Sequence, residues 1–182
     1  MKGIIFLEFL ELVEAKFGLD MADDIIESCN LPSGAAYTAV GTYAFGEMVQ
    51  LVTALSARIS VPVPDLLQVY GEHLLGRFAI KYPTHFDGVQ DTFQMLEKLD
   101  GTIHVEVKKL YPEAELPSFE ATRVSEDRLA LLYRSSKPLS TLAYGLIAGC
   151  AGHFGETITI QMDDRSSDGQ TEVLFDLTRL SA

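Results

Sequence analysis

A single histidine stands among apolar neighbours in the segment LDGTIHVEVKKLYPEAELPSF, which covers residues 99–119. A lone imidazole such as His104 is either a structural histidine, satisfied by groups around it, or a metal ligand. The segment reads as a helix that is interrupted by Gly101 and stops at the pair Tyr111-Pro112. Because one histidine does not decide between the two roles, the interpretation depends on the polar side chains found elsewhere in the chain.

A second group of reactive side chains lies in RLALLYRSSK, where Tyr133, Ser135 and Lys137 alternate with other residues. Alternation along a strand places such side chains on one face, in steps of about 7 Å. A phenol, a hydroxyl and a cation in a row could bind the carboxylates of a ligand. The same pattern also fits a solvated outer strand face with an aromatic edge. Pro117, thirteen residues after His104, is the remaining feature of this region.

Other catalytic and metal-binding patterns are missing from the sequence. It contains no GxSxG, HExxH, P-loop or GxGxxG motif, so we expect no enzyme. Asp163, Asp164 and Asp168 lack the spacing and the closing glutamate of a calcium loop, and Asp168-Gly169 is typical of a β-hairpin turn. The other three histidines have no second ligand three or four residues away, and we expect them at the surface or the edge of the core. They are His73, His85 and His153.

Composition limits the classes of partner and compartment. The chain has 182 residues, 47% of them apolar, which suits one domain with a full core. A net charge of −12 argues against nucleic acid and against anionic membranes as partners. The apolar stretch at 139–152 is too short and too polar to span a bilayer, and the N-terminal segment does not resemble a signal peptide. Two distant cysteines without a CxxC motif favour reduced thiols in the cytoplasm and argue against structural zinc.

The hydrophobic periodicity predicts helices first and strands afterwards. Phe6, Phe9, Leu10 and Val13 recur at helical spacing. Helices are expected at residues 21–29, 42–59, 66–78, 89–110 and 139–153, and strands at 119–124, 128–134, 157–162 and 171–177. This order predicts an α+β fold with an antiparallel sheet. We expect a single domain over 1–182, with a helical part at about 1–117 and a sheet-containing part at about 118–182.

Several motifs together make the sequence resemble the haem nitric oxide/oxygen-binding family, H-NOX. The similarity runs nearly end to end, through MKGIIF at the start, LLQVYG in the helix expected at 66–78, and the H-x6-YP…PSF spacing around His104. The most specific motif is Y-x-S-x-R, which stands here as Tyr133-Arg134-Ser135-Ser136-Lys137. Lysine therefore replaces the family's arginine.

The resemblance implies a cofactor and the residues that hold it. A b-type haem would be buried between the helical part and the sheet, with His104 as the proximal ligand of its iron. Tyr133, Ser135 and Lys137 would hold the two propionates, although lysine offers a point charge where arginine offers a bidentate fork. Pro117 matches the family proline that presses on the macrocycle. The zinc-binding cysteines and histidine of a family subset have no counterpart at residues 161–164.

The resemblance also predicts which gas is bound. Oxygen-binding members place a tyrosine on the distal side, and the corresponding residue here is Leu142. Bound dioxygen needs a hydrogen-bond donor, whereas nitric oxide does not. Tyr144 is close in sequence, but two residues along a helix correspond to a rotation of about 200°, so it should point away. The other distal positions are also apolar: Ile5, Phe9, Leu74 and Phe78. We therefore expect binding of nitric oxide and carbon monoxide, with oxygen excluded.

A sensor of this kind needs a separate output protein. The resemblance implies a histidine kinase or a diguanylate cyclase as the partner, controlled by a two-state change that follows release of the bond to His104. Two alternatives stay open at the level of sequence. One is a haem carrier or electron-transfer protein, and the other is an interaction module of the same fold that has lost its haem.

Overall fold

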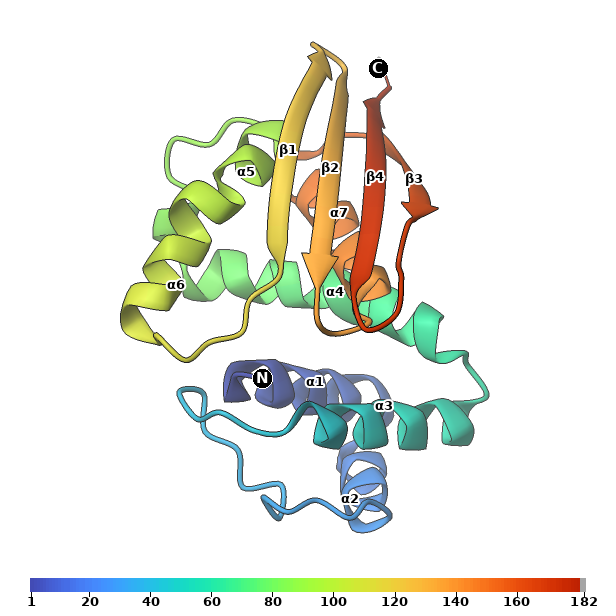
Figure 1. Ribbon diagram of the computed structural model, residues 1–182. Helices are drawn as coiled ribbons and strands as arrows, with labels where there is room; N and C mark the ends of the chain where they lie inside the picture. The colour runs from blue at the N-terminus through green and yellow to red at the C-terminus, as the bar shows by residue number, and fades with distance from the viewer. Residues whose placement is uncertain (181–182) are drawn as a thin grey trace.

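The structure is a computed structural model that describes residues 1–180. Its first three helices lie together at the bottom of Figure 1 and are α1 (Gly3–Phe17), α2 (Leu19–Glu27) and α3 (Phe45–Ile59). The helix predicted at 42–59 begins three residues later than expected. Thr42 instead pairs with Lys2 in an isolated β-bridge, and the Tyr43 backbone N–H donates to the Met1 carbonyl at 2.9 Å. The start of the chain is thereby fixed to the loop before α3.

Helices α4 (Val63–Lys81) and α7 (Ser140–Phe154) cross at very short range. A Cβ atom on Gly71 would lie 2.4 Å from the Leu142 carbonyl oxygen, and one on Gly145 would lie 2.1 Å from the Gln68 carbonyl oxygen. Only glycine allows two backbones to approach this closely. Both helices were expected, although α4 extends beyond the predicted 66–78 at both ends. Their crossing brings Leu142 to the side of α4 that carries Leu74.

The helix predicted at 89–110 is three consecutive segments, α5 (Thr92–Lys98), the π-helix η2 (Leu99–Ile103) and α6 (His104–Leu110). It begins at Thr92 because the Asp91 side chain caps it, accepting from the Gln94 backbone N–H at 2.8 Å. Gly101 lies inside η2, where the hydrogen-bond pattern widens. π-Helical turns occur frequently at functional sites. A short 3-10 turn, η1 (Pro83–His85), lies between α4 and α5.

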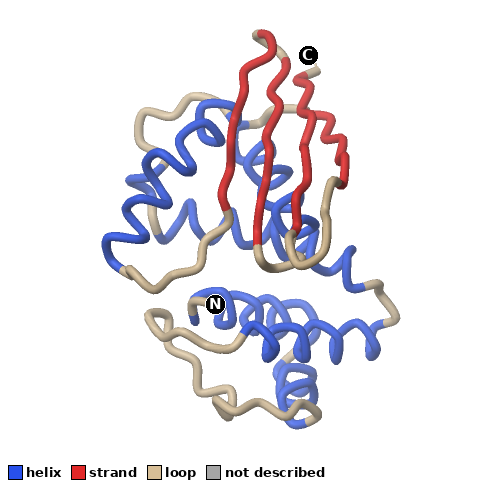
Figure 2. Tube along the Cα trace, in the orientation of Figure 1, coloured by secondary structure: helices blue, strands red, loops and turns tan. Residues whose placement is uncertain are grey.

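Four antiparallel strands form one sheet in the order β1-β2-β4-β3. The strands are β1 (Ser118–Ser125), β2 (Arg128–Ser135), β3 (Ile158–Asp164) and β4 (Thr171–Arg179). The predicted α+β fold with an antiparallel sheet is confirmed. Figures 1 and 2 show α7 against one face of the sheet, with α4 crossing on the same side behind the lower ends of the strands. The turn between β3 and β4 contains Gly169 at φ +81° and a bridge between Ser167 and Gln170, as the hairpin signal predicted.

The buried apolar side chains form two clusters. The first contains side chains of the four helices α1, α2, α3 and α4 and of one side of α7, with Phe9, Leu74 and Leu142 among its members. The second joins the sheet to α5 and the other side of α7, with Phe93 and Tyr133 among its members. Each fully buried Phe or Leu contributes about 1.5–3 kcal/mol through removal of apolar surface from water. Helix α6 has no buried residue, so little of this packing holds it in place.

Candidate functional site

The imidazole of His104 is oriented by a carboxylate one helical turn before it. Asp100 lies in η2, and its Oδ1 is 2.7 Å from His104 Nδ1. The second oxygen of Asp100 accepts the Phe119 backbone N–H at 2.8 Å, which fixes the carboxylate against the start of β1. This bond assigns the proton to Nδ1 and leaves Nε2 as the basic nitrogen, the arrangement that metal-binding histidines adopt. The side chain of His104 is 18% exposed, and its ring lies 5.8 Å from that of Phe119.

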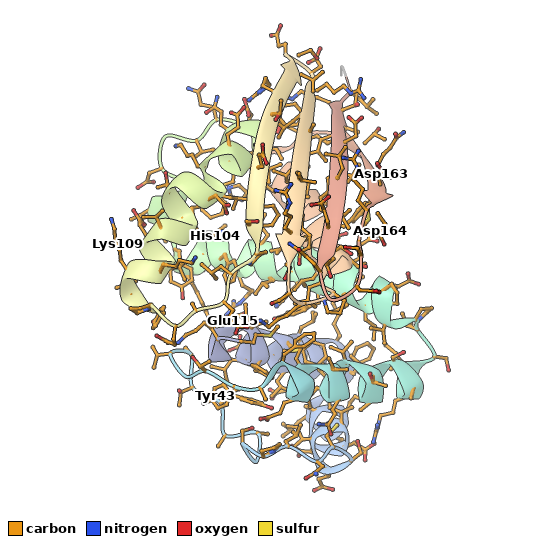
Figure 3. The ribbon with its side chains drawn as sticks, viewed as in Figure 1. Tyr43, His104, Lys109, Glu115, Asp163 and Asp164 are labelled. Carbon is orange, nitrogen blue, oxygen red and sulfur yellow. The ribbon has the colours of Figure 1, made fainter. Side chains whose placement is uncertain are left out.

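Sequence reasoning missed Asp100. The available signal was the i, i+4 spacing of an acidic residue and a histidine on a helix. The spacing alone is common, and its meaning appears only when the second carboxylate oxygen is found to bond to the strand. Figure 3 shows His104 on the helix that leads into the segment carrying Glu115.

The side chains Tyr133, Ser135 and Lys137 lie at the end of β2. Tyr133 is 2% exposed and points with Leu129 and Leu131 to the inner face of the sheet. Burial raises the pKa of its phenol, and the Ser135 hydroxyl acts in the opposite direction, so Tyr133 remains a neutral donor. The strand ends at Ser135, and Lys137 lies beyond it in the loop, where its backbone N–H donates to Ser135 Oγ at 3.0 Å.

Lys137 has an acidic partner that the sequence did not predict. Its Nζ forms an ion pair with Glu115, and this pairing lowers the pKa of the Glu115 carboxyl. The N-terminal ammonium lies near both side chains, and burial followed by the charge of Lys137 lowers its pKa below 8.0. The end of β2 therefore presents the cation of Lys137 paired with the Glu115 carboxylate, and the carboxylate of an anionic ligand could take the place of Glu115.

The five apolar side chains expected on the distal side all belong to the first cluster. Phe9, Leu74 and Leu142 are buried in it, whereas Ile5 and Phe78 pack against it and remain partly exposed. They come from α1, α4 and α7.

Tyr144 packs against the second cluster, on the other side of α7 from Leu142, as its helical position predicted. Its phenol therefore does not face the side chains listed above.

A buried phenol that the sequence did not single out lies beside this group. Tyr70 on α4 is 1% exposed, and its ring meets that of Phe9 edge-on at 5.4 Å. Its hydroxyl donates to the Ile5 carbonyl oxygen. Burial, together with the charge of Glu8, raises its pKa well above 10.0. The proton stays on the phenol and is already engaged by the backbone.

Pro117 lies half-buried in the segment between α6 and β1, close in sequence to Phe119. Phe119 and Leu99 pack against the second cluster and are also only partly covered. Both clusters thus carry partly exposed apolar side chains, and Lys137 adds a charged group to this region. This arrangement fits a flat apolar ligand with carboxylates at one edge, as in a haem.

The remaining predicted features lie elsewhere. Asp163 and Asp164 are exposed at the end of β3, as Figure 3 shows. Cys29 and Cys150 are free thiols, and burial raises the pKa of Cys150 to about 12. His73 lies at the edge of the core with Nε2 4.0 Å from Glu8.

Among residues 1–180, two surface hollows are lined by neither His104 nor the residues at the end of β2. One, of about 280 Å³, lies beside His85 and Glu106, and the other is between α2 and α3.

The sequence model of the Haem-NO-binding family matches residues 2–162. The chain belongs to the H-NOX family. The resemblance stated from the sequence is therefore confirmed, and H-NOX domains bind haem in a fold that senses gases.

Solved H-NOX structures match over the whole chain. One from K. algicida, in an unliganded Fe(II) state, is 41% identical, covers 100% of this chain and 98% of its own, and has a TM-score of 0.92. One from Shewanella woodyi, in the Fe(II)CO ligation state, is 40% identical, with 99% and 95% coverage and a TM-score of 0.85. One from S. oneidensis, in the Fe(II)NO ligation state, is 27% identical, with 100% coverage of both chains and a TM-score of 0.91.

Comparison of this H-NOX domain with curated proteins gave no match. Within residues 1–180, no helix has the length and apolar character needed to cross a membrane.

Proposed function

We propose that this H-NOX domain senses nitric oxide at a ferrous b-type haem, excludes oxygen, and regulates a separate signalling protein. The observation that carries the proposal is the His104 imidazole, whose Nδ1 is held by Asp100 so that Nε2 is the nitrogen available to iron. Ferrous haem would supply the iron and an open position for a diatomic gas. A Fe(II)NO state of the S. oneidensis relative and a Fe(II)CO state of the S. woodyi relative support these two ligands.

The residues of this chain would hold the haem at three places. His104 would bind the iron through Nε2, and its hydrogen bond to Asp100 would increase the basicity of the ring. Tyr133, Ser135 and Lys137 would bind the propionates at the end of β2, with Lys137 contributing charge but not a bidentate fork. Pro117 would contact the macrocycle from the same side as His104.

Oxygen exclusion follows from the absence of a free donor on the distal side. In the described part of the chain, the five residues assigned to that side, Leu142 included, carry no polar side-chain atom. Tyr70 on α4 is a buried phenol in the same cluster, and its hydroxyl already donates a hydrogen bond to the Ile5 carbonyl oxygen. Without a donor, the negative charge that develops on bound oxygen is not stabilised, whereas nitric oxide does not need this interaction.

Signalling would begin at His104. If the bond between the iron and the His104 imidazole were lost, α6 would be free to move relative to the sheet, because it has no buried residue of its own. Only a gas that binds the two arrangements differently can shift the balance between them. We propose a histidine kinase or a diguanylate cyclase as the protein that reads this change.

Absorption spectra of the reduced protein, before and after nitric oxide, test this function. We expect a five-coordinate ferrous spectrum that changes with nitric oxide and carbon monoxide and does not change with oxygen. His104→Gly should lose haem and regain it when imidazole is supplied. A six-coordinate spectrum would favour the haem carrier or electron-transfer protein, and a purified protein that cannot be loaded with haem would favour the interaction module.

A further inference from the structure

The side chain of Lys2 is enclosed at the junction between the N-terminal helices and the segment that follows α6. It is 13% exposed, and its Nζ donates to the Val40 carbonyl at 2.6 Å and to Thr42 Oγ1 at 3.1 Å. Both acceptors belong to the loop before α3. An ammonium group has three protons to donate, so these two bonds leave one for another partner.

The third partner comes from the segment after α6. Lys2 Nζ lies 3.4 Å from Glu113 Oε1 and 3.9 Å from the centre of the Tyr111 ring. A cation over an aromatic face and beside a carboxylate is held by both interactions. Lys2 provides the ion pair and the cation–π contact that join the segment after α6 to the N-terminal part of the chain, and Glu113 also accepts a hydrogen bond from Thr42.

The backbone around Lys2 is firmly joined to the N-terminal helices. The Gly3 N–H donates to the Gly41 carbonyl at 2.8 Å, and the Ile4 N–H donates to the Ala39 carbonyl at 3.1 Å. The N-terminal ammonium donates to the Tyr43 carbonyl at 2.8 Å. Any force on the Lys2 side chain is therefore transmitted to α1 and to the loop at 36–43.

The three consecutive segments α5, η2 and α6 are fixed to the sheet at their other end, in α5. The ring of Phe93 in α5 contacts two guanidinium groups, Arg123 at 5.0 Å and Arg179 at 4.6 Å from its centre. The Thr92 backbone N–H donates to Glu156 at 2.8 Å, and Arg123 also bonds to Glu97 at 2.9 Å. A fixed α5, a π-helical turn and an α6 without buried residues together form a lever, and its end opposite α5 lies at Tyr111, where Lys2 contacts it. Figure 1 shows the loop that follows α6 passing above the start of the chain.

We infer that Lys2 is a positioning residue that transmits displacement of α6 to the N-terminal helices. This inference rests on the proposed function for the origin of the displacement, namely release of His104, but the connection itself is a property of the fold. A neutral side chain of similar length at position 2 keeps the backbone bridge to Thr42 and removes the ammonium, and with it the ion pair to Glu113 and the cation–π interaction with Tyr111. In such a variant, α6 should move without moving the loop at 36–43.

Hydrogen–deuterium exchange of the haem-loaded protein tests this. In the wild type we expect nitric oxide to change exchange in the peptides covering 104–117 and 36–43. In Lys2→Met, the change at 104–117 should persist while the change at 36–43 falls to a small fraction. Lys16→Met, which removes a charge from the exposed end of α1, is the matched control and should behave as the wild type. The difference caused by nitric oxide is the readout, because a purely structural role for Lys2 would shift only the baseline. A full response at 36–43 in Lys2→Met overturns the inference.

A second arm needs no gas and separates this inference from the proposed function. Lys109→Gly weakens the exposed last turn of α6 and should raise local opening about fivefold, as glycine does in a helix. Exchange at 36–43 should then rise in the otherwise wild-type protein and stay constant when Lys2→Met is also present. An equal rise in both backgrounds, or no rise in either, overturns the connection through Lys2. A rise confined to the wild-type background, in a protein that shows no response to nitric oxide, supports the connection and counts against the proposed function.

Discussion

The bond between Asp100 and His104 sets how firmly the candidate iron ligand is held. The carboxylate accepts two hydrogen bonds, at 2.7 Å from His104 Nδ1 and at 2.8 Å from the Phe119 backbone N–H. In Asp100→Asn one amide oxygen remains as an acceptor, and the NH2 group that replaces the other oxygen cannot accept a hydrogen bond. One of the two bonds is therefore lost, and the negative charge that makes His104 more basic disappears.

The magnitude follows from the exposure of the pair. Losing a hydrogen bond to a charged group costs about 1.5–3 kcal/mol, which agrees with the 10–100-fold loss of metal affinity typical of such partners. The Asp100 side chain is 38% exposed, so water can replace part of the lost bond. We therefore expect the lower end of the range, a loss of about tenfold in haem affinity, equivalent to about 1.4 kcal/mol.

The assay is the rate of haem transfer from the loaded protein to an excess of a haem-scavenging apoprotein. We expect Asp100→Asn to release haem about tenfold faster than the wild type. Resonance Raman spectra should show a lower iron–histidine stretching frequency. Asp127→Asn, in the exposed turn between β1 and β2, removes the same charge far from His104 and is the control. Unchanged haem release together with an unchanged stretching frequency would refute the role assigned to Asp100.

Three further substitutions test other parts of the site. Lys137→Arg restores a bidentate fork at the end of β2, and haem transfer should slow severalfold; faster transfer would mean that position 137 does not contact the propionates. Leu142→Tyr places a donor on the distal side and should produce an oxygen-dependent absorption change in the reduced protein, whereas an oxygen response already present in the wild type would contradict the selectivity argument. Glu8→Gln removes a fully buried carboxylate. Burial raises the pKa of Glu8, but the hydrogen bonds from Lys81 and Arg77 outweigh burial, so the pKa lies below its ordinary value of 4.5. The wild type holds this contribution above about pH 4.5 and loses it as pH falls through the lower folded-state pKa. Because Arg77 and Lys81 are each 32% exposed and can be solvated, the variant should lose about 1.5 kcal/mol of unfolding free energy near neutral pH and show a weaker acid dependence in urea titrations; equal urea midpoints at neutral pH would rule this out.

Much of the fold was readable from the chain because its signals are local. Helical spacing of apolar residues located α1, α3 and α4, and alternation followed by Asp168-Gly169 located the β3–β4 hairpin. The boundaries were less accurate where distant residues decide them. The helix α3 starts at Phe45 because Thr42 is paired with Lys2, a partner forty positions away. Motifs resembling H-NOX also led to the proposal of His104 as the iron ligand and of the residues at the end of β2 as the propionate site, because motif spacing can be read from the sequence.

Only the tertiary structure decided how the candidate site is supported. The sequence contains Asp100 and Tyr70, but their roles depend on the Phe119 N–H and the Ile5 carbonyl, groups that come from other elements. Lys2 likewise acquires its environment from two loops that meet in space. Hydrogen bonds and ion pairs between distant segments require a fixed distance and direction, and these exist only once the chain is folded. Residue types and spacing thus determined the fold class and the candidate ligand, whereas folding determined what holds that ligand and what it can move.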